Sequence, residues 1–131
     1  MKPLLLFLTL FLSSLLAADE VLYCIPKLST GFDDSDNYSK SINFSQPRFS
    51  VKVHGDFEKI DIGGFPMVCE TRDESIYTCT HAYDYGTFFK YNKNTKRFLS
   101  VVIGDFGYLS YPSKAGQHDS DILRAGECEK F

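Results

Sequence analysis

The histidines of this chain are the first place to look for reaction chemistry. His54, His81 and His118 are its three histidines, and Asp84 follows His81 by three positions. A histidine near a carboxylate can act as a general base whose orientation the carboxylate fixes. The His81 and Asp84 pair is therefore the candidate for a hydrolase-type enzyme, and the same two residues with His118 are the candidate metal ligands.

No nucleophile accompanies that histidine in the sequence. No serine stands in a G-x-S-x-G pattern, and the cysteines are better explained as disulfides. A metal site would also require two separate loops to converge. We therefore expect a chain without catalytic residues, metal or cofactor, and the enzyme remains the alternative.

Four cysteines form the second chemical feature of the sequence: Cys24, Cys69, Cys79 and Cys128. An even number in an exported chain indicates two disulfides, and four cysteines allow three pairings. We favour Cys69–Cys79, because facing residues of a hairpin have Cα atoms about 4.5–5.5 Å apart, together with Cys24–Cys128, which ties the two ends. Zinc is the alternative ligand, but structural zinc sites usually contain a C-x₂₋₄-C spacing that this chain lacks.

The first 18 residues have the pattern of a secretory signal peptide. Met1-Lys2 supplies a positive start, Leu4–Leu16 is a mainly apolar run, and Ala17-Ala18 precedes acidic residues. The apolar run is shorter than the roughly 18 residues that span a bilayer. We expect cleavage after Ala18, export to the periplasm or the medium, no stable membrane insertion afterwards, and a single domain over residues 19–131.

The composition of the chain restricts the fold classes and the kinds of partner that are possible for it. The formal charge is −3, and it becomes −4 if Lys2 is removed, which argues against nucleic acid and anionic lipid surfaces as partners. The chain has no Trp but 12 Phe and 8 Tyr. Scattered Gly and Pro with no helical period are typical of an all-β domain. We expect a small antiparallel β-barrel or sandwich of about eight short strands, held by two disulfides, and a monomer.

A hairpin over residues 87–103 is the element around which the fold is predicted to form. Two aromatic and β-branched runs flank the polar turn NKNTK. Pairing Tyr91 with Phe98 places Phe89 opposite Ser100 and Phe88 opposite Val101. The predicted faces are Phe89, Tyr91, Phe98 and Val102 on one side, and Phe88, Leu99, Val101 and Ile103 on the other. Because both faces are apolar, we expect a central hairpin.

Further strands are predicted on both sides of that hairpin. Strict alternation of apolar and polar residues makes Arg48–His54 the clearest of them. Pro26 is expected to end the first strand, and Gly31 to mark a turn or bulge. The predicted strands are Val21–Ile25, Arg48–His54, Lys59–Ile62, the pair around Cys69 and Cys79, Tyr108–Tyr111 and Ile122–Cys128.

The acidic segment 33–40 is predicted to be a solvated loop. Alternate acidic positions resemble a calcium loop, but the glycine and glutamate that complete an EF-hand are missing. Asn37 and Asn43 both fit the N-glycosylation pattern, which matters only in a eukaryotic source.

Tyrosines in loops and at strand ends are the candidate binding residues. Tyrosine offers a rigid apolar body with a polar tip, which suits recognition. Core packing of the aromatic residues is the alternative interpretation. The candidate binding residues are His81, Tyr83, Asp84, Tyr85, Tyr108 and Tyr111.

Three segments resemble a family of small, exported, uncharacterised bacterial proteins. They are YCIPKLSTGF near the start, FKYNKNTKRF followed by GYL, and ILRAGECEKF at the end. The family has a Cys…STGF opening, an F-x-Y-N…RF hairpin and a closing I-x-x-G-x-C segment. Members often have a Trp soon after STGF, where this chain has the acidic DDSDN sequence. The resemblance implies export in a bacterium and closure by Cys24–Cys128, and it carries over no functional residue.

The leading functional hypothesis is a non-catalytic exported β-domain that binds a protein partner or a small ligand through its loops. One form of this hypothesis is an inhibitor of a secreted hydrolase. The alternatives are a periplasmic hydrolase-type enzyme using His81 and Asp84, and a purely structural component of the cell envelope.

Overall fold

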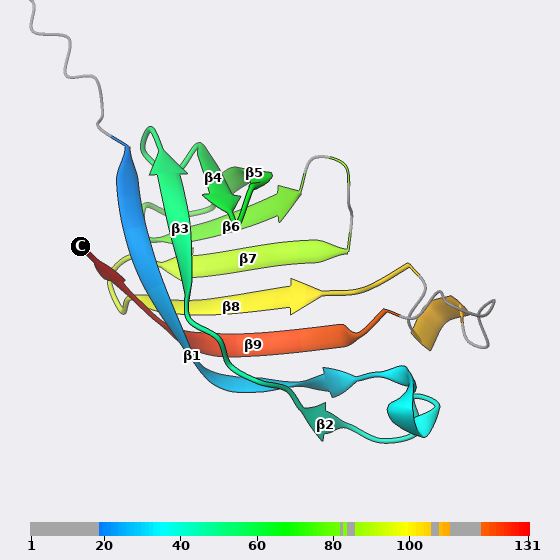
Figure 1. Ribbon diagram of the computed structural model, residues 1–131. Helices are drawn as coiled ribbons and strands as arrows, with labels where there is room; N and C mark the ends of the chain where they lie inside the picture. Colours follow the sequence, from blue (N-terminus) through cyan, green and yellow to red (C-terminus); the bar gives the residue numbers. More distant parts are fainter. Residues whose placement is uncertain (1–18, 82, 84–85, 106–107, 111–118) are drawn as a thin grey trace, which may run out of the picture.

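Antiparallel strands make up most of the chain in a computed structural model that describes residues 19–81, 83, 86–105, 108–110 and 119–131 (Figure 1). Two short 3₁₀ helices, η1 (Asp34–Asp36) and η2 (Tyr108–Ser110), accompany the strands. The strands are β1 (Glu20–Phe32), β2 (Ile42–Asn43), β3 (Phe49–His54), β4 (Lys59–Ile62), β5 (Phe65–Thr71), β6 (Ile76–His81), β7 (Thr87–Asn92), β8 (Arg97–Val102) and β9 (Asp121–Lys130).

The sheet closes on itself as a barrel. From β3 to β9 each strand pairs with the next one along the chain, and β1 pairs with both β3 and β9. Eight strands therefore form a closed antiparallel barrel, while β2 adds a short ribbon to the far end of β1. The predicted all-β fold with about eight short strands is confirmed, as a barrel.

The first strand is longer than predicted. β1 continues through Pro26 to Phe32, and its register with β9 shifts between Pro26 and Leu28. A bulge tolerates proline, because the proline there leaves no ladder hydrogen bond unmade. The expected strand end at Pro26 is therefore wrong.

Gly31 lies within β1, opposite Ile122 of β9, so the expected turn or bulge at this glycine is also wrong. A Cβ atom at this position would stand 1.8 Å from the backbone oxygen of Asp121. Glycine is therefore required here by the close approach of the two strands.

The hairpin of β7 and β8 has the predicted register. Tyr91 pairs with Phe98, Phe89 with Ser100, and Phe88 with Val101. Each strand has a neighbour on its other side, so the hairpin is central as expected. Phe89, Tyr91 and Phe98 are buried inside the barrel. Phe88, Leu99 and Ile103 on the opposite face are partly exposed on the outer wall.

An aromatic stack fills one end of the barrel. Phe57, in the turn between β3 and β4, stacks on Tyr77 and Tyr91 with ring centroids 4.3 and 5.4 Å away. Its φ of 58° is in the left-handed region, and its side chain is buried. Lys93 donates a hydrogen bond to the Tyr77 hydroxyl at 3.3 Å, and this bond raises the pKa of Lys93. We call Phe57, Tyr77 and Tyr91 the aromatic plug.

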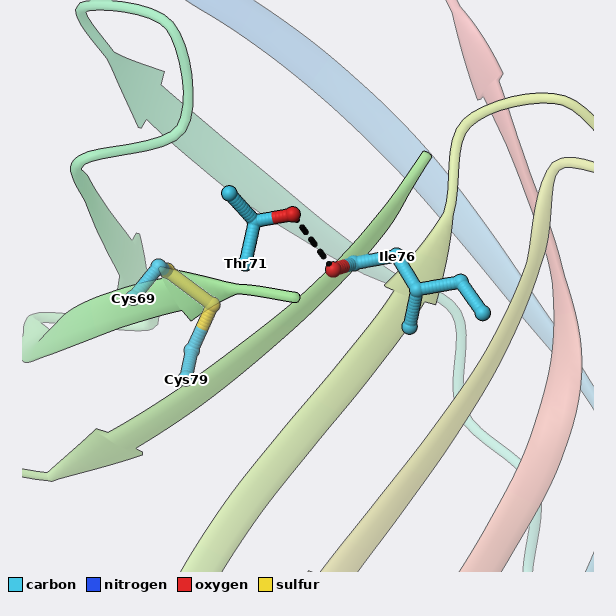
Figure 2. Close-up of a disulfide and its surroundings, with 4 residues drawn as sticks. All are labelled: Cys69, Thr71, Ile76 and Cys79. Carbon is cyan, nitrogen blue, oxygen red and sulfur yellow. Dashed lines mark hydrogen bonds between the residues drawn. A yellow bond between two sulfur atoms is a disulfide. The ribbon is translucent and has the colours of Figure 1, made fainter. Parts of the chain in front are cut away.

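Both disulfides have the favoured pairing. Cys24–Cys128 joins β1 to β9 and is fully buried. Cys69–Cys79 joins β5 to β6, close to a hydrogen bond from the Thr71 hydroxyl to the Ile76 carbonyl at 2.9 Å (Figure 2). Two disulfides indicate an oxidising environment, extracellular or periplasmic.

Two predicted segments differ in detail from the structure. Residues Tyr108–Ser110 form the helix η2, so the strand expected over Tyr108–Tyr111 is wrong where the chain is described, and Tyr111 lies outside that part. In the acidic segment Tyr38 is buried and donates a hydrogen bond to the Asp119 carbonyl at 2.8 Å, although most of its neighbours are exposed. Burial raises the pKa of the Tyr38 hydroxyl, and the nearby carboxylates add to the effect.

Adjacent residues of β8 provide a direct test of the barrel interior. Phe98 is 3% exposed and Leu99 is 49% exposed. Truncating a buried aromatic side chain costs about 3–5 kcal/mol. Phe98→Ala should therefore unfold the protein or nearly so, whereas Leu99→Ala should cost less than about 1 kcal/mol. Equal shifts of the two urea midpoints would contradict this assignment of the inner face.

The two disulfides should differ in their contribution to stability. They close loops with sequence separations of 104 and 10 residues. The chain-entropy relation gives about 4.7 kcal/mol for the long loop and about 2.7 kcal/mol for the short one. Replacing Cys24 and Cys128 with alanine should therefore lower the urea midpoint more than the same change at Cys69 and Cys79. The reverse order would show that loop closure is not the main contribution.

Candidate functional site

The barrel is hollow at the end opposite the aromatic plug. The hollow, called the cup below, has a volume of about 580 Å³. The arrowheads of β6 and β8 point toward this end, and the turn between β3 and β4 lies at the other (Figure 1). Six apolar side chains that line the cup are Phe49, Ile62, Phe65, Met67, Phe89 and Val102.

Alternation along the strands aims these side chains into the cup. Met67 and Phe89 are fully buried members of the core, and they form its deeper wall. Beneath them Phe98 stacks on Phe89 with ring centroids 5.7 Å apart and meets Phe49 edge-on at 5.3 Å. The floor of the cup is therefore a packed aromatic layer, which holds the shape of the cavity.

A row of polar residues crosses this apolar interior. Phe89 of β7 pairs with Ser100 of β8, Ser100 with Arg124 of β9, and Arg124 with Ser29 of β1. Residues that pair directly across antiparallel strands lie on the same face of the sheet. Ser100 and Arg124 line the cup, and Ser29, which is 3% exposed, lies beside Arg124.

Two atoms of this row are buried without a hydrogen-bond partner in the described part of the chain. They are Nε of Arg124 and the hydroxyl oxygen of Ser29. Leaving a buried polar group unpaired costs about 1–3 kcal/mol, and more for a charged group. Asp121, three residues before Arg124, accepts the backbone N–H groups of Gly104 and Tyr108 instead. The cup therefore combines apolar walls with an arginine that no described carboxylate neutralises.

His81, the histidine predicted as a general base, lies in the wall of the cup. It ends β6, and its Nδ1 accepts the backbone N–H of Tyr83 at 3.4 Å. Its ring meets the rings of Phe65 and Tyr83 edge-on, 6.0 and 6.1 Å away. Its predicted partner Asp84 lies outside the described residues, as does Tyr85. The described surroundings of His81 are mainly aromatic and contain no activated nucleophile.

The predicted tyrosines do not form one site. Tyr83 is 87% exposed at the end of β6, beside His81. Tyr108 is 64% exposed and packs edge-on against Tyr38, 6.3 Å away. Tyr111 is outside the part of the chain that the structure describes. Of the predicted binding residues that are described, His81 lines the cup.

Sequence reasoning missed Ser29, Ser100 and Arg124. A signal was present for Arg124: Cys128 is predicted to pair with Cys24 in the last strand, and strand alternation then places residues 126 and 124 on the same face as this cysteine. Gly126 is indeed covered by Phe98, since a Cβ atom there would stand 2.8 Å from the Phe98 ring. Ser29 was hidden by the strand end expected at Pro26.

A second hollow, of about 600 Å³, lies over the outer wall of β7, β8 and β9. Long, exposed side chains such as Leu28 and Leu99 border it. Lys27 and Glu127 at its edge form an ion pair at 2.7 Å, and that contact lowers the pKa of the Glu127 carboxyl. Lys27 and Glu127 are thus paired with each other, and we assign no ligand to this hollow.

Within the described residues no cluster of three His, Cys, Asp or Glu side chains could hold a metal ion. None of the helices described here is long and apolar enough to cross a membrane. Comparison with protein-family models, with curated proteins and with solved structures finds no match.

Proposed function

We propose that the protein is a non-catalytic binding domain that holds a small, mainly apolar ligand in the cup. The observation that carries the proposal is the mainly apolar lining of the cup, a hollow of about 580 Å³ at the end of the barrel opposite the aromatic plug. Ligand sites are mostly apolar hollows of about 300–1,000 Å³ with a few placed polar groups, and the cup agrees with this description.

The cup favours a small ligand over the other hypotheses. An enzyme using His81 would need a nucleophile or an activated water, and the described neighbours of this histidine are Phe65 and Tyr83. An inhibitor of a secreted hydrolase, or a structural envelope component, would make no use of an apolar hollow of this size. These alternatives have no comparable observation in their favour.

Export is part of the proposal. The charged start, the apolar run Leu4–Leu16 and the small residues Ala17-Ala18 support cleavage of a signal peptide, and the two disulfides support an oxidising compartment. We place the domain in the periplasm or outside the cell of a bacterium, in line with the resemblance of its three segments to exported bacterial proteins.

Titration with a neutral apolar fluorophore, N-phenyl-1-naphthylamine, tests ligand binding. The wild-type protein should bind it saturably with increased fluorescence. Val102→Trp places a large ring in the cup and should abolish the increase, whereas Val101→Trp, on the opposite face of β8, should preserve it.

Both variants must keep the far-ultraviolet circular dichroism of the wild type. Ser100→Phe, which fills the cup from a position two residues earlier on the same strand, serves as a second test if Val102→Trp does not fold. Absence of saturable binding to the wild type, or equal binding by the inner and outer variants, would overturn the proposal.

A further inference from the structure

We infer that the ligand of the cup is an amphiphilic monocarboxylate, whose carboxylate binds the guanidinium group of Arg124 and whose apolar body lies against Met67 and Phe89. This inference rests on the proposed function and specifies its ligand. It starts from the buried Nε of Arg124, which has no hydrogen-bond partner among the described residues.

Arg124 is partly buried and forms no ion pair with a described carboxylate, so a ligand anion in the cup can serve as its counterion. An arginine stays protonated under all ordinary conditions, so it cannot escape burial by losing its proton. The described part of the chain provides it with no ion pair, since Asp121 is engaged by two backbone N–H groups. An anionic ligand would neutralise the positive charge of Arg124 and would also accept a hydrogen bond from its unpaired Nε–H group.

The geometry of the Arg124 guanidinium group favours a carboxylate as the ligand's head group. A guanidinium presents Nε–H and an Nη–H side by side, and this fork matches the two oxygens of a carboxylate. Ser29 and Ser100 flank Arg124 in the same row, and the hydroxyl of Ser29 is a second buried group without a described partner. The cup thus offers the hydroxyl group of Ser100 beside a planar cationic fork.

The single permanent positive charge among the described lining residues of the cup favours a ligand with one negative charge. Arg124 supplies the one permanent cation among the described residues that line the cup. A phosphate dianion would therefore remain half neutralised in an apolar surrounding, which is costly. The whole chain is negative, with a formal charge of −3, so it does not attract anions in general. The attraction is confined to the cup, where an apolar tail must enter together with the head group.

Displacement of N-phenyl-1-naphthylamine by decanoate and by decan-1-ol tests the inference. The two ligands share their chain length and differ in the head group. Hydrogen bonds to charged groups contribute about 1.5–3 kcal/mol, so decanoate should bind at least ~10-fold more tightly than the alcohol. Both are used below the concentration at which they aggregate.

Variants at two arginines test whether Arg124 causes the preference for decanoate over decan-1-ol. Arg124→Met should remove the preference for decanoate while retaining the binding of decan-1-ol, and it should melt no lower than the wild type because a buried unpaired donor is removed. Arg97→Met, at an exposed arginine on the outer wall, should keep the preference. Arg124→Lys should show a preference for decanoate that is stronger than in Arg124→Met but weaker than in the wild type, because an ammonium group lacks the planar fork of a guanidinium.

The outcomes separate the two proposals. If neither decanoate nor decan-1-ol displaces the probe, and the probe itself does not bind, the proposed function fails. If both bind with equal affinity, or if Arg124→Met keeps the preference for decanoate, the cup binds ligands but the assignment of a carboxylate to Arg124 is overturned.

Discussion

The seam between β1 and β9 is the constraint on which the rest of this structure depends. β1 pairs with β3 along its first half and with β9 along nearly its whole length, and the Cys24–Cys128 bridge fixes this seam covalently. Without it the remaining strands would form an open sheet with two unpaired edges. Because the sheet is closed, one face of every strand points into the barrel. Apolar residues therefore alternate with polar residues along the strands.

Closure also accounts for the site. Filling a small closed barrel takes large side chains, and this chain uses aromatic rings at one end, where Phe57 enters from a turn, and leaves the other end incompletely filled. A polar row on β8, β9 and β1 crosses the interior there, and its members Ser100 and Arg124 line the cavity. The buried Nε of Arg124 has no described partner, and an unpaired buried donor lowers the stability of the free protein. Proteins accept such costs at functional sites, where a ligand completes the missing contacts.

Local pattern was enough to predict the fold class, the hairpin of β7 and β8 with its register, and the Cys69–Cys79 pair, while Cys24–Cys128 was favoured because it ties the two ends of the domain. It failed where tertiary contacts override local preferences: Pro26 is accommodated by a bulge, and Gly31 is explained by β9, a partner distant in sequence. The site was harder to predict. The predicted site residues are mainly histidine and tyrosines in loops. Arginine is usually exposed, so Arg124 becomes a candidate only when its place on the inward face of β9 is known.

The central claim is that a ligand carboxylate meets Arg124 within the cup. Carbon-13 NMR of decanoate labelled at the carboxyl carbon tests it most directly, because the chemical shift reports ionisation. A carboxylate bound to a guanidinium should stay ionised at lower pH than the free acid, so its pKa should fall on binding and should rise above the free value in Arg124→Met, where an apolar wall disfavours the charge. A bound carboxyl that titrates at or above the pKa of the free acid in the wild-type protein would contradict the account.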